Sequence, residues 1–330
     1  MSSDPSMIEN GQAAVVECIV QRLRGASRIL LCSHERPDGD SLGSELALGM
    51  ALERLGKQAI MFNADEAPLH YRFLPRVGSL THTLPGPDDY DLVVVLDCGG
   101  VERIGPALTA EKPIINIDHH PSNSGFGDLV WVEERTAAVG VMIARLIGAL
   151  GVKVTREIAT CLMTAILTDT GSFRYMTATR ELFEIAGRLA EAGADSAEIS
   201  RQVFMSQPRH MVQMAGEVIN SMHFEYDGKL AWSEITQDIL LRNGGEANVP
   251  EGLAAQLRNI EGVEVACLLQ ETAPERCRAS LRSAGRFDVG RIAQQLGGGG
   301  HHNAAGVTLN VLYPEAREKV LAILREHLSE

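Results

Sequence analysis

Short runs of wholly apolar residues alternate with longer amphipathic segments through the first half of this chain, and this alternation constrains the fold most. The run LVVVL at 92–96 has no polar position on either face. A strand that is apolar on both faces is typical of a parallel sheet covered by helices. We therefore predict an α/β domain with strands at Arg28–Cys32, Gln58–Phe62, Leu92–Leu96 and Pro113–Ile117, and helices at Gln12–Leu23, Leu42–Leu55, Ala137–Leu150 and Thr155–Leu167.

The rest of the chain predicts a smaller α+β domain. Helical periodicity runs from Arg180 to Glu217, and we place the connection between the domains within it. The expected organisation is a catalytic domain at 1–190, a helical linker at 191–215 and a second domain at 216–330, with a cleft between the domains. In the second domain we expect strands at Met222–Tyr226, Leu230–Ile235, Val263–Glu271, Arg276–Arg282 and Gly306–Val311, and helices at Glu251–Ile260, Asp288–Leu296 and Pro314–Leu328.

Composition and charge narrow the function classes. The 330 residues are 45% apolar and 22% charged, and no apolar run reaches the roughly 18 residues that span a bilayer. The six cysteines include no C-x-x-C pair, and MSSDPSMIEN lacks the features of a signal peptide, so we expect a cytoplasmic protein. The net charge of −13 argues against binding to long nucleic acid or to an anionic membrane. It leaves room for an anionic substrate that metals or a few arginines bind locally.

Carboxylate and imidazole side chains cluster at four places where apolar strands or helices end. One aspartate after a strand is more often a helix N-cap or a turn former than a ligand. Four such clusters in one α/β domain are different, because open α/β sheets bind ligands at the edge where their strands end. The clusters are His34, Asp38 and Asp40 in HERPDGD, Asp97 after LVVVL, Asp118-His119-His120 after an apolar strand, and Asp169 after an apolar helical run.

These clusters predict a metal centre. Carboxylates that are brought together raise one another's pKa, and divalent cations relieve the repulsion. A ligand set of aspartate and histidine without cysteine suits a hard or borderline ion such as Mn²⁺ or Mg²⁺. Two such ions about 3.5–4 Å apart activate water and clamp phosphoryl oxygens. Phosphoester hydrolysis is therefore the expected chemistry.

The same motifs, in this order, resemble those of the DHH phosphoesterase superfamily. HERPDGDSLGS resembles its first motif and TDTGSFR at 168–174 its fourth, and Asp97 stands at the second. The third is the triplet that names the superfamily, Asp118-His119-His120. GGGGHHNAAG at 297–306 is similar to the GGGHxxAAG signature of the DHHA1 domain, so the resemblance covers most of the chain.

The resemblance implies a role for each matching position. Asp97 would bridge two ions, most often Mn²⁺ with Mg²⁺ or Co²⁺ as alternatives, and share a nucleophilic water with them. His120 would position the substrate or assist proton transfer as a second catalytic residue, and Asp118 would support the site. The ligands would be His34, Asp38 and Asp97 for one ion, and Asp40, Asp97, His119 and Asp169 for the other.

The second domain carries an anion-binding pattern. Period-two alternation places Arg276, Arg278 and Arg282 on one face of a strand, where solvated arginines are the alternative interpretation. The string SLRS resembles a substrate-contacting strand of DHHA1, which favours Arg282. We expect Gly297 to end a helix and the next glycines to let backbone N–H groups approach an anion. The expected substrate-binding residues are His120, Arg282, Gly298, Gly299, Gly300 and His301.

A DHH domain followed by DHHA1 resembles the nanoRNase-like subgroup of bifunctional oligoribonucleases and pAp phosphatases. The resemblance implies a hydrolase that degrades very short RNA to mononucleotides and converts 3′-phosphoadenosine 5′-phosphate (pAp) to AMP, with a homodimer as a family-level expectation. The alternative is a cyclic or linear dinucleotide phosphodiesterase, which would use the same residues. A manganese inorganic pyrophosphatase, a RecJ-type long exonuclease and a catalytically inactive nucleotide-binding module have less support.

Overall fold

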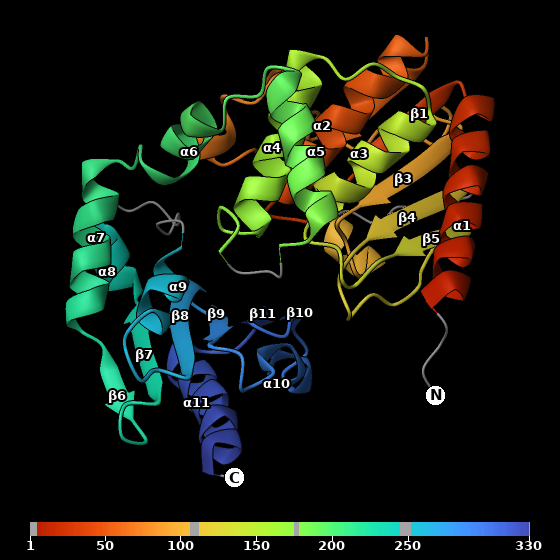
Figure 1. Ribbon diagram of the computed structural model, residues 1–330. Coiled ribbons are helices and arrows are strands. Elements are labelled where there is room, and N and C mark those ends of the chain that lie inside the picture. Colours follow the sequence, from red (N-terminus) through yellow and green to blue (C-terminus); the bar gives the residue numbers. More distant parts are fainter. Residues whose placement is uncertain (1–4, 106–111, 175–177, 245–251, 330) are drawn as a thin grey trace. The chain divides into compact units, whose positions relative to one another are not determined.

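The computed structural model describes residues 5–105, 112–174, 178–244 and 252–329. The chain divides into two compact units, Met1–Ser206 and Gln207–Glu330 (Figure 1). The division falls inside the region that the sequence predicts to be a helical linker, at 191–215. The predicted class is confirmed, since the first unit holds a parallel sheet with helices and the second holds a mixed sheet with helices.

The first unit is built on a five-stranded parallel sheet in the order β2-β1-β3-β4-β5. The predicted strands are confirmed, with the fourth displaced by one residue, and β5 was not predicted because it is a short edge strand of four residues. The strands are β1 Arg28–Cys32, β2 Gln58–Phe62, β3 Leu92–Leu96, β4 Ile114–Asp118 and β5 Leu129–Val132.

Six helices belong to the described residues of the first unit, together with three 3₁₀ turns. Four of these helices were predicted as separate elements, with ends that differ by up to seven residues, and the last two lie within the helical periodicity predicted from Arg180 to Glu217. The helices are α1 Pro5–Gly25, α2 Gly39–Arg54, α3 Val139–Ala149, α4 Arg156–Asp169, α5 Arg180–Glu191 and α6 Ser196–Phe204, and the turns are η1 Leu69–Tyr71, η2 Val77–Ser79 and η3 Val101–Ile104.

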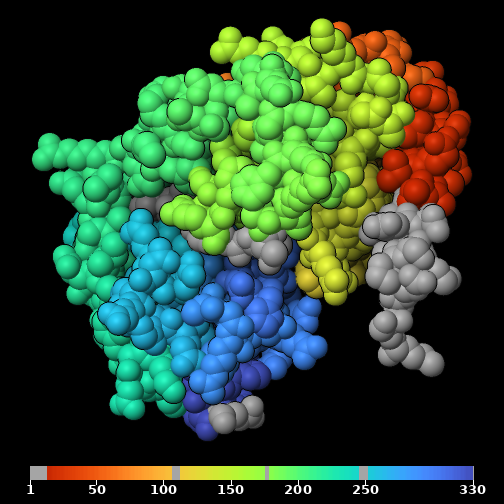
Figure 2. All heavy atoms as spheres, in the orientation of Figure 1, coloured from red at the N-terminus to blue at the C-terminus, as the bar shows by residue number. Residues whose placement is uncertain are grey.

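The two faces of this sheet are covered by different kinds of structure. On one face, Ile29 and Val94 pack into a core with apolar residues of α1, α2, α3 and α4. On the other face, Leu30 and Val93 pack with Ile104 and other apolar residues of the connecting segments. In the space-filling view, the yellow-green and green atoms of the segment that contains α3, α4 and α5 form much of the visible face of the first unit (Figure 2). The predicted burial of both strand faces is therefore present, with helices on one side of the sheet.

Glycines let α2, α3 and α4 pack with their backbones close together. A Cβ atom at Gly39 would collide with the Thr168 side chain of α4, and one at Gly43 would collide with the carbonyl oxygen of Cys161. A Cβ at Gly140 in α3 would lie 2.6 Å from the Cβ of Ala165. These approaches place the N-terminal turn of α2 beside the C-terminal turn of α4, where Asp40 and Asp169 lie.

The second unit is built on a six-stranded mixed sheet in the order β10-β11-β9-β8-β7-β6, in which β7 and β8 are parallel and the other pairs are antiparallel. One face packs with α10 and α11, and the other packs with α7, α8 and α9. The strands are β6 His223–Glu225, β7 Leu230–Ile235, β8 Val265–Ala273, β9 Arg276–Ser283, β10 Gly299–His301 and β11 Ala304–Leu309. The helices are α7 Arg209–Asn220, α8 Gln237–Arg242, α9 Leu253–Arg258, α10 Val289–Gln295 and α11 Tyr313–Ser329.

The predicted elements of the second unit are present, and two short elements were missed. Residue Glu251 of the predicted helix lies outside the described residues. The helix α8 has only six residues, and β10 consists of two glycines and a histidine, so neither gives a periodic signal. The prediction that Gly297 ends a helix is confirmed, because its φ is +80° and the N–H of Gly298 donates to the carbonyl of Ala293.

Among the described residues, no helix combines the length and the apolar character that crossing a bilayer requires.

Replacing Gly43 with alanine should destabilise the first unit, because the added Cβ would meet the Cys161 carbonyl oxygen, a backbone atom that moves only with α4. We expect the free energy of unfolding to fall by about 1–3 kcal/mol in urea denaturation followed by circular dichroism. Gly148→Ala in α3 is the matched control, since a Cβ there meets no atom within 4 Å and alanine is favoured in helices by about 0.5–1 kcal/mol. Equal responses of the two variants would contradict this account of the helix packing.

Candidate metal centre

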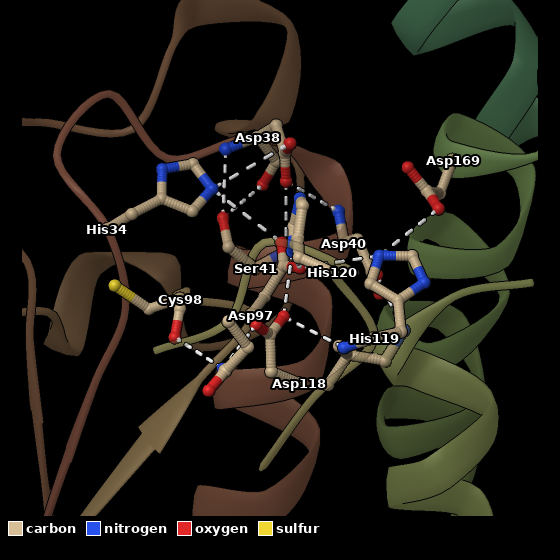
Figure 3. Close-up of polar contacts among 12 residues, drawn as sticks. His34, Asp38, Asp40, Ser41, Asp97, Cys98, Asp118, His119, His120 and Asp169 are labelled. Atoms are coloured by element: carbon tan, nitrogen blue, oxygen red, sulfur yellow. Dashed lines mark hydrogen bonds and ion pairs between the residues drawn. The ribbon is translucent and has the colours of Figure 1, made fainter. Parts of the chain in front are cut away.

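The four predicted clusters converge in the first unit (Figure 3). Parallel strands deliver part of the site, because β1 is followed by His34, β3 by Asp97, and β4 ends at Asp118. Helices deliver the rest: Asp38 caps α2 and Asp169 is the last residue of α4. The remaining residues of the set are Asp40 in the first turn of α2 and His119 and His120 directly after β4.

The carboxylate of Asp97 lies between two groups of side chains. Its Oδ2 is 3.6 Å from Nε2 of His34, and its Oδ1 is 3.6 Å from Nε2 of His119. His34 Nε2 is also 3.9 Å from Oδ2 of Asp38. His119 Nε2 is 3.8 Å from Oδ2 of Asp40 and 3.6 Å from Oδ2 of Asp169. The structure therefore brings together the residues of both predicted ligand sets around one shared carboxylate.

Asp97 is held in a strained and poorly solvated state. Its backbone φ is +53°, in the left-handed region that residues other than glycine seldom occupy. The side chain is 3% exposed, and Oδ1 has no hydrogen-bond partner among the described residues. Burial, together with the charges of Asp40 and Asp38, raises the pKa of Asp97 well above its usual value. A buried carboxylate oxygen without a donor is the environment that a bound cation satisfies.

Asp40 caps a helix to which it does not belong. Its Oδ2 accepts a hydrogen bond from the N–H of Val139 at 2.6 Å, and its Oδ1 accepts one from the N–H of Gly140 at 2.8 Å. These are the first amides of α3, whose own N-cap residue, Ala138, has no capping side chain. Burial and the nearby charge of Asp169 nevertheless raise the pKa of Asp40 to about 7.

Backbone carbonyls set the orientation of the two histidine rings whose Nε2 atoms face Asp97, those of His34 and His119. His34 Nδ1 lies 2.8 Å from the carbonyl oxygen of Glu35, and His119 Nδ1 lies 3.0 Å from that of Thr136. A carbonyl only accepts, so Nδ1 donates in each case and Nε2 points toward the carboxylates. Burial alone would lower the pKa of His119, but the surrounding carboxylates, Asp169 first, raise it to about 9. A cation that replaces this proton would find Nε2 already aimed at it.

The carboxylate of Asp118 connects the backbone at His119 with the ring of His120. Its Oδ1 accepts hydrogen bonds from the N–H of His119 at 2.8 Å and from Nδ1 of His120 at 2.7 Å. Its Oδ2 accepts one from Nδ2 of Asn123 at 2.6 Å. The hydrogen bonds from His120 and Asn123 outweigh the effect of burial and hold the pKa of Asp118 well below its usual value. Asp118 therefore stays ionised and fixes the ring of His120.

Asp38 combines the two roles that the sequence presented as alternatives. Its Oδ1 accepts from the N–H groups of Asp40 and Ser41 and caps α2, and the N–H of Asp38 donates to Ser41 Oγ in return. Its other oxygen, Oδ2, faces His34. The carboxylate that starts the helix thus also contributes to the ligand group.

The donor set of the two groups fits divalent cations. The ligand atoms of His34, Asp38 and Asp97 all lie within 4.8 Å of one another, and so do those of Asp40, His119 and Asp169. The atoms are oxygens and imidazole nitrogens, without sulfur, a set that a divalent ion such as Mn²⁺ accepts, whereas Mg²⁺ prefers oxygen ligands alone.

In the second unit, the predicted substrate residues lie on neighbouring strands. The alternation of β9 is confirmed: Cys277, Ala279 and Leu281 are buried, and the residues between them are more accessible. His301 of β10 and Arg282 of β9 each pair with Ala304 of β11, from opposite sides. Residues that pair across antiparallel strands share a face, so His301 and Arg282 lie in one row on one face of the sheet.

The glycine run has a structural explanation that the sequence did not reveal. A Cβ at Gly298 would collide with the carbonyl oxygen of Gly306, and one at Gly300, whose φ is +141°, would lie 2.5 Å from the carbonyl oxygen of Ala304. Close approach of β10 to β11 therefore accounts for these two glycines independently of any ligand.

Several supporting residues escaped the sequence interpretation. Asn123 was visible in the string DHHPSN but gave no signal by itself, since asparagine is common in turns. Thr136 acts through a backbone carbonyl and Val139 and Gly140 act through backbone amides. Backbone donors and acceptors leave no trace in side-chain chemistry, so the sequence did not identify them.

Replacing Asp97 with asparagine should stabilise the protein in a metal chelator at pH 8. The pKa of Asp97 is raised by folding, so its contribution to stability is lost as pH rises through that pKa. Asparagine removes the charge, keeps the shape and tolerates positive φ. We expect a higher Tm than the native chain has, by about 2–4 °C for each kcal/mol gained, and a smaller difference at pH 5.

Asp91→Asn is the control of opposite sign, measured by the same thermal denaturation. Its hydrogen bonds with Arg28, including one of 2.7 Å, lower the pKa of Asp91, so removing this charge should lower the Tm at pH 8. A lower Tm for both variants would show that the charge at Asp97 does not strain the fold.

Comparisons with known proteins identify the family. The chain matches the DHH family, N-terminal domain, over residues 28–166 and the DHHA1 domain over residues 228–330. It is 35% identical over 302 residues to the bifunctional oligoribonuclease and PAP phosphatase NrnA of Thermus thermophilus, which covers 91% of this chain and 90% of that protein. The protein of the same name from Bacillus subtilis is 27% identical over 286 residues, covering 85% of this chain and 89% of that protein.

Solved structures agree with this fold. An exopolyphosphatase-related protein from Bacteroides fragilis has a TM-score of 0.84 at 26% identity and covers 96% of this chain and 98% of its own. RecJ from Thermus thermophilus in complex with Mn²⁺ has a TM-score of 0.51 at 16% identity, covering 97% of this chain and 54% of its own, and shares the fold. With two domain matches and a relative that is similar over nine-tenths of its length, this chain belongs to the DHH family of phosphoesterases and carries a DHHA1 domain after its DHH domain.

Proposed function

We propose that this chain is a metal-dependent phosphodiesterase of the cytoplasm that hydrolyses short oligoribonucleotides to mononucleotides and converts pAp to AMP. The names of the relatives from Thermus thermophilus and Bacillus subtilis support this substrate class, and both relatives align with most of the chain. The observation that carries the mechanism is the carboxylate of Asp97, whose two oxygens face two different histidine–carboxylate groups. A homodimer stays a prediction.

Two divalent cations, Mn²⁺ by preference, would be held around Asp97. When bound, they supply Lewis-acid activation of water and neutralise charge on phosphoryl oxygens. The residues of this chain pre-arrange the ligand atoms, since carbonyl groups orient the rings of His34 and His119 and helix amides hold Asp40. The proposed ligands are His34, Asp38 and Asp97 for one ion and Asp40, Asp97, His119 and Asp169 for the other.

His120 takes a catalytic role beside the ligands in this proposal. Nδ1 of His120 donates a hydrogen bond to Oδ1 of Asp118 at 2.7 Å, and this bond fixes the plane of the His120 ring. A histidine ring held in this way can donate to a phosphate oxygen or transfer a proton. His120 thereby positions the scissile phosphate or delivers a proton to the leaving oxygen.

The DHHA1 unit would bind the substrate through Arg282, Gly298, Gly299, Gly300 and His301. The row formed by His301, Ala304 and Arg282 supports this assignment, because the small Ala304 separates an imidazole from a guanidinium on one face. Arginine binds phosphate through two parallel hydrogen bonds. The strand β10 is at the edge of its sheet, and outward N–H groups of an edge strand are donors for anions.

An activity panel with Mn²⁺ tests the reaction. The native chain should convert labelled dinucleotides and five-nucleotide RNA to mononucleotides and pAp to AMP, and a chelator should abolish each activity. The variant Asp97→Ala should lose turnover of every substrate because both ions share this carboxylate. Product analysis by chromatography measures each outcome.

The same panel, with cyclic di-AMP and pyrophosphate added as substrates, separates the alternative functions. Turnover of cyclic di-AMP or of a linear dinucleotide alone would favour a dinucleotide phosphodiesterase, and turnover of pyrophosphate alone would refute the proposed substrate class. Full activity of Asp97→Ala would refute the two-metal assignment.

Replacing Arg282 with alanine should raise KM more than it lowers kcat, because the side chain contributes substrate binding and not the activated water. A hydrogen bond to a charged group is worth about 1.5–3 kcal/mol, so we expect KM to rise about 10-fold or more. Arg286→Ala is the control, since Arg286 is an exposed residue that pairs with Glu264 at 3.3 Å. Unchanged steady-state kinetics for Arg282→Ala would remove this residue from the proposed site.

A further inference from the structure

A partly buried ion pair lies in the first unit next to the residues that hold the proposed metal ligands in place. Glu133 follows β5 and Arg145 lies on α3. The guanidinium of Arg145 binds the carboxylate through two hydrogen bonds, Nη1 to Oε1 at 3.1 Å and Nη2 to Oε2 at 2.6 Å. Trp131 Nε1 donates to Oε1 at 2.8 Å, and Thr136 Oγ1 donates to Oε2 at 2.7 Å. Four donors thus converge on one carboxylate that is 8% exposed.

The backbone on both sides of Glu133 is tied to the metal site. The N–H of Glu133 donates to the carbonyl of Asp118 at 3.0 Å, and the N–H of Thr136 donates to the carbonyl of Glu133 at 2.9 Å. This turn presents the Thr136 carbonyl, which accepts from Nδ1 of His119. Because the side chain of Glu133 also binds Thr136 Oγ1, the carboxylate fixes the carbonyl that orients the His119 ring.

The other half of the pair acts on Asp40. Arg145 is on the same helix as Val139 and Gly140, whose amides hold the Asp40 carboxylate. The ion pair ties that helix to Glu133, so the distance between the α3 N-terminus and the turn at 133–136 is fixed. The guanidinium of Arg145 also lies over the ring of Trp131, 5.7 Å from the ring centroid, and this contact further restricts the position of the guanidinium.

We propose that Glu133 and Arg145 are positioning residues for one of the two metal positions, the one formed by Asp40, His119 and Asp169. Both routes from the pair lead to ligands of that position. His34 takes its orientation from the Glu35 carbonyl and Asp38 from the first amides of α2, neither of which the pair contacts. The pair therefore acts on the two ion positions unequally, and this inference rests on the proposed two-metal function.

Manganese binding by titration calorimetry, with free Mn²⁺ followed by electron paramagnetic resonance, tests the proposal. The native chain should bind two ions. Glu133→Gln keeps the shape of the side chain and removes its charge, and it should weaken one of the two binding steps about 10–100-fold, as is typical of residues that orient metal ligands. The other step should keep its native affinity.

Ligand-deficient backgrounds assign the weakened step. In Asp38→Asn, where the remaining tight ion is the one at Asp40, His119 and Asp169, adding Glu133→Gln should weaken it. In Asp169→Asn, where the remaining ion is the one at His34 and Asp38, adding Glu133→Gln should change nothing. The reverse pattern, or equal weakening in both backgrounds, would overturn the proposal.

A matched control separates positioning from general stability. Glu53 and Arg76 form a similar two-bond pair in the first unit, at 2.8 and 2.9 Å, without contact to the ligands. Glu53→Gln should leave both manganese affinities at the native value. If Glu133→Gln lowers the Tm and still binds both ions with native affinity, the pair is merely structural.

Two milder variants decide the question if Glu133→Gln does not fold. Arg145→Lys keeps the charge and loses the paired hydrogen bonds, and Thr136→Val removes one donor to Glu133 and keeps the backbone carbonyl. Each should weaken the same single step by a smaller factor, and native binding in both would refute the inference. A native chain that binds no Mn²⁺ would instead refute the two-metal function itself, before any variant is considered.

Discussion

The repulsion among buried carboxylates around Asp97 is the constraint on which the architecture of the first unit depends. Hydrogen-bond donors compensate the charges of Asp40 and Asp118 at the edge of the cluster, but no such donor in the described part of the chain compensates Oδ1 of Asp97 at its centre. Asp40 receives two helix amides and Asp118 receives an imidazole, an amide side chain and a backbone N–H. Asp97 Oδ1 has no such donor among the described residues, and the backbone there adopts a positive φ. A strained backbone and a buried carboxylate oxygen without a hydrogen-bond donor persist only where the surrounding structure holds them in place. The carboxylate of Asp97 therefore still requires a positive charge beside it.

Close helix packing supplies that surrounding structure. Gly39, Gly43 and Gly140 allow three helices to meet with almost no side-chain volume between them, so the residues beside these glycines are fixed by backbone contacts. Two of the ligand-bearing helix ends, at Asp40 and Asp169, belong to helices that pack this way. Long side chains at these positions would have separated the carboxylates and relieved the repulsion. The glycines thus force together the charges whose clustering the site requires.

The sequence predicted the fold of the first unit and the composition of its site because both leave side-chain patterns. Buried parallel strands read as continuous apolar runs, and three of the four predicted runs are followed within two residues by His34, Asp97 or Asp118. The sequence failed where the backbone acts: it did not reveal the Thr136 carbonyl or the amides of Val139 and Gly140. It also missed short elements such as β5 and β10, which have too few residues to show a period. Gly298 and Gly300 were interpreted through ligand binding, and contacts with β11 that only the fold creates explain them as well.

The net charge of the chain favours local recognition of an anionic substrate, as proposed for the DHHA1 unit. A net charge of −13 produces a repulsive field for any polyanion, but salt screens that field beyond about 8–10 Å. Short-range groups can therefore bind an anion that the whole protein repels. The row of His301, Ala304 and Arg282, proposed as part of the substrate site, spans two strand spacings, about 10 Å. That span would suit a small nucleotide better than an extended nucleic-acid strand. Added salt should therefore weaken the repulsion of long RNA more than that of short RNA, because only the long chain extends into the repulsive field. The ratio of the affinities for long and short RNA, measured at increasing salt, should shift toward long RNA.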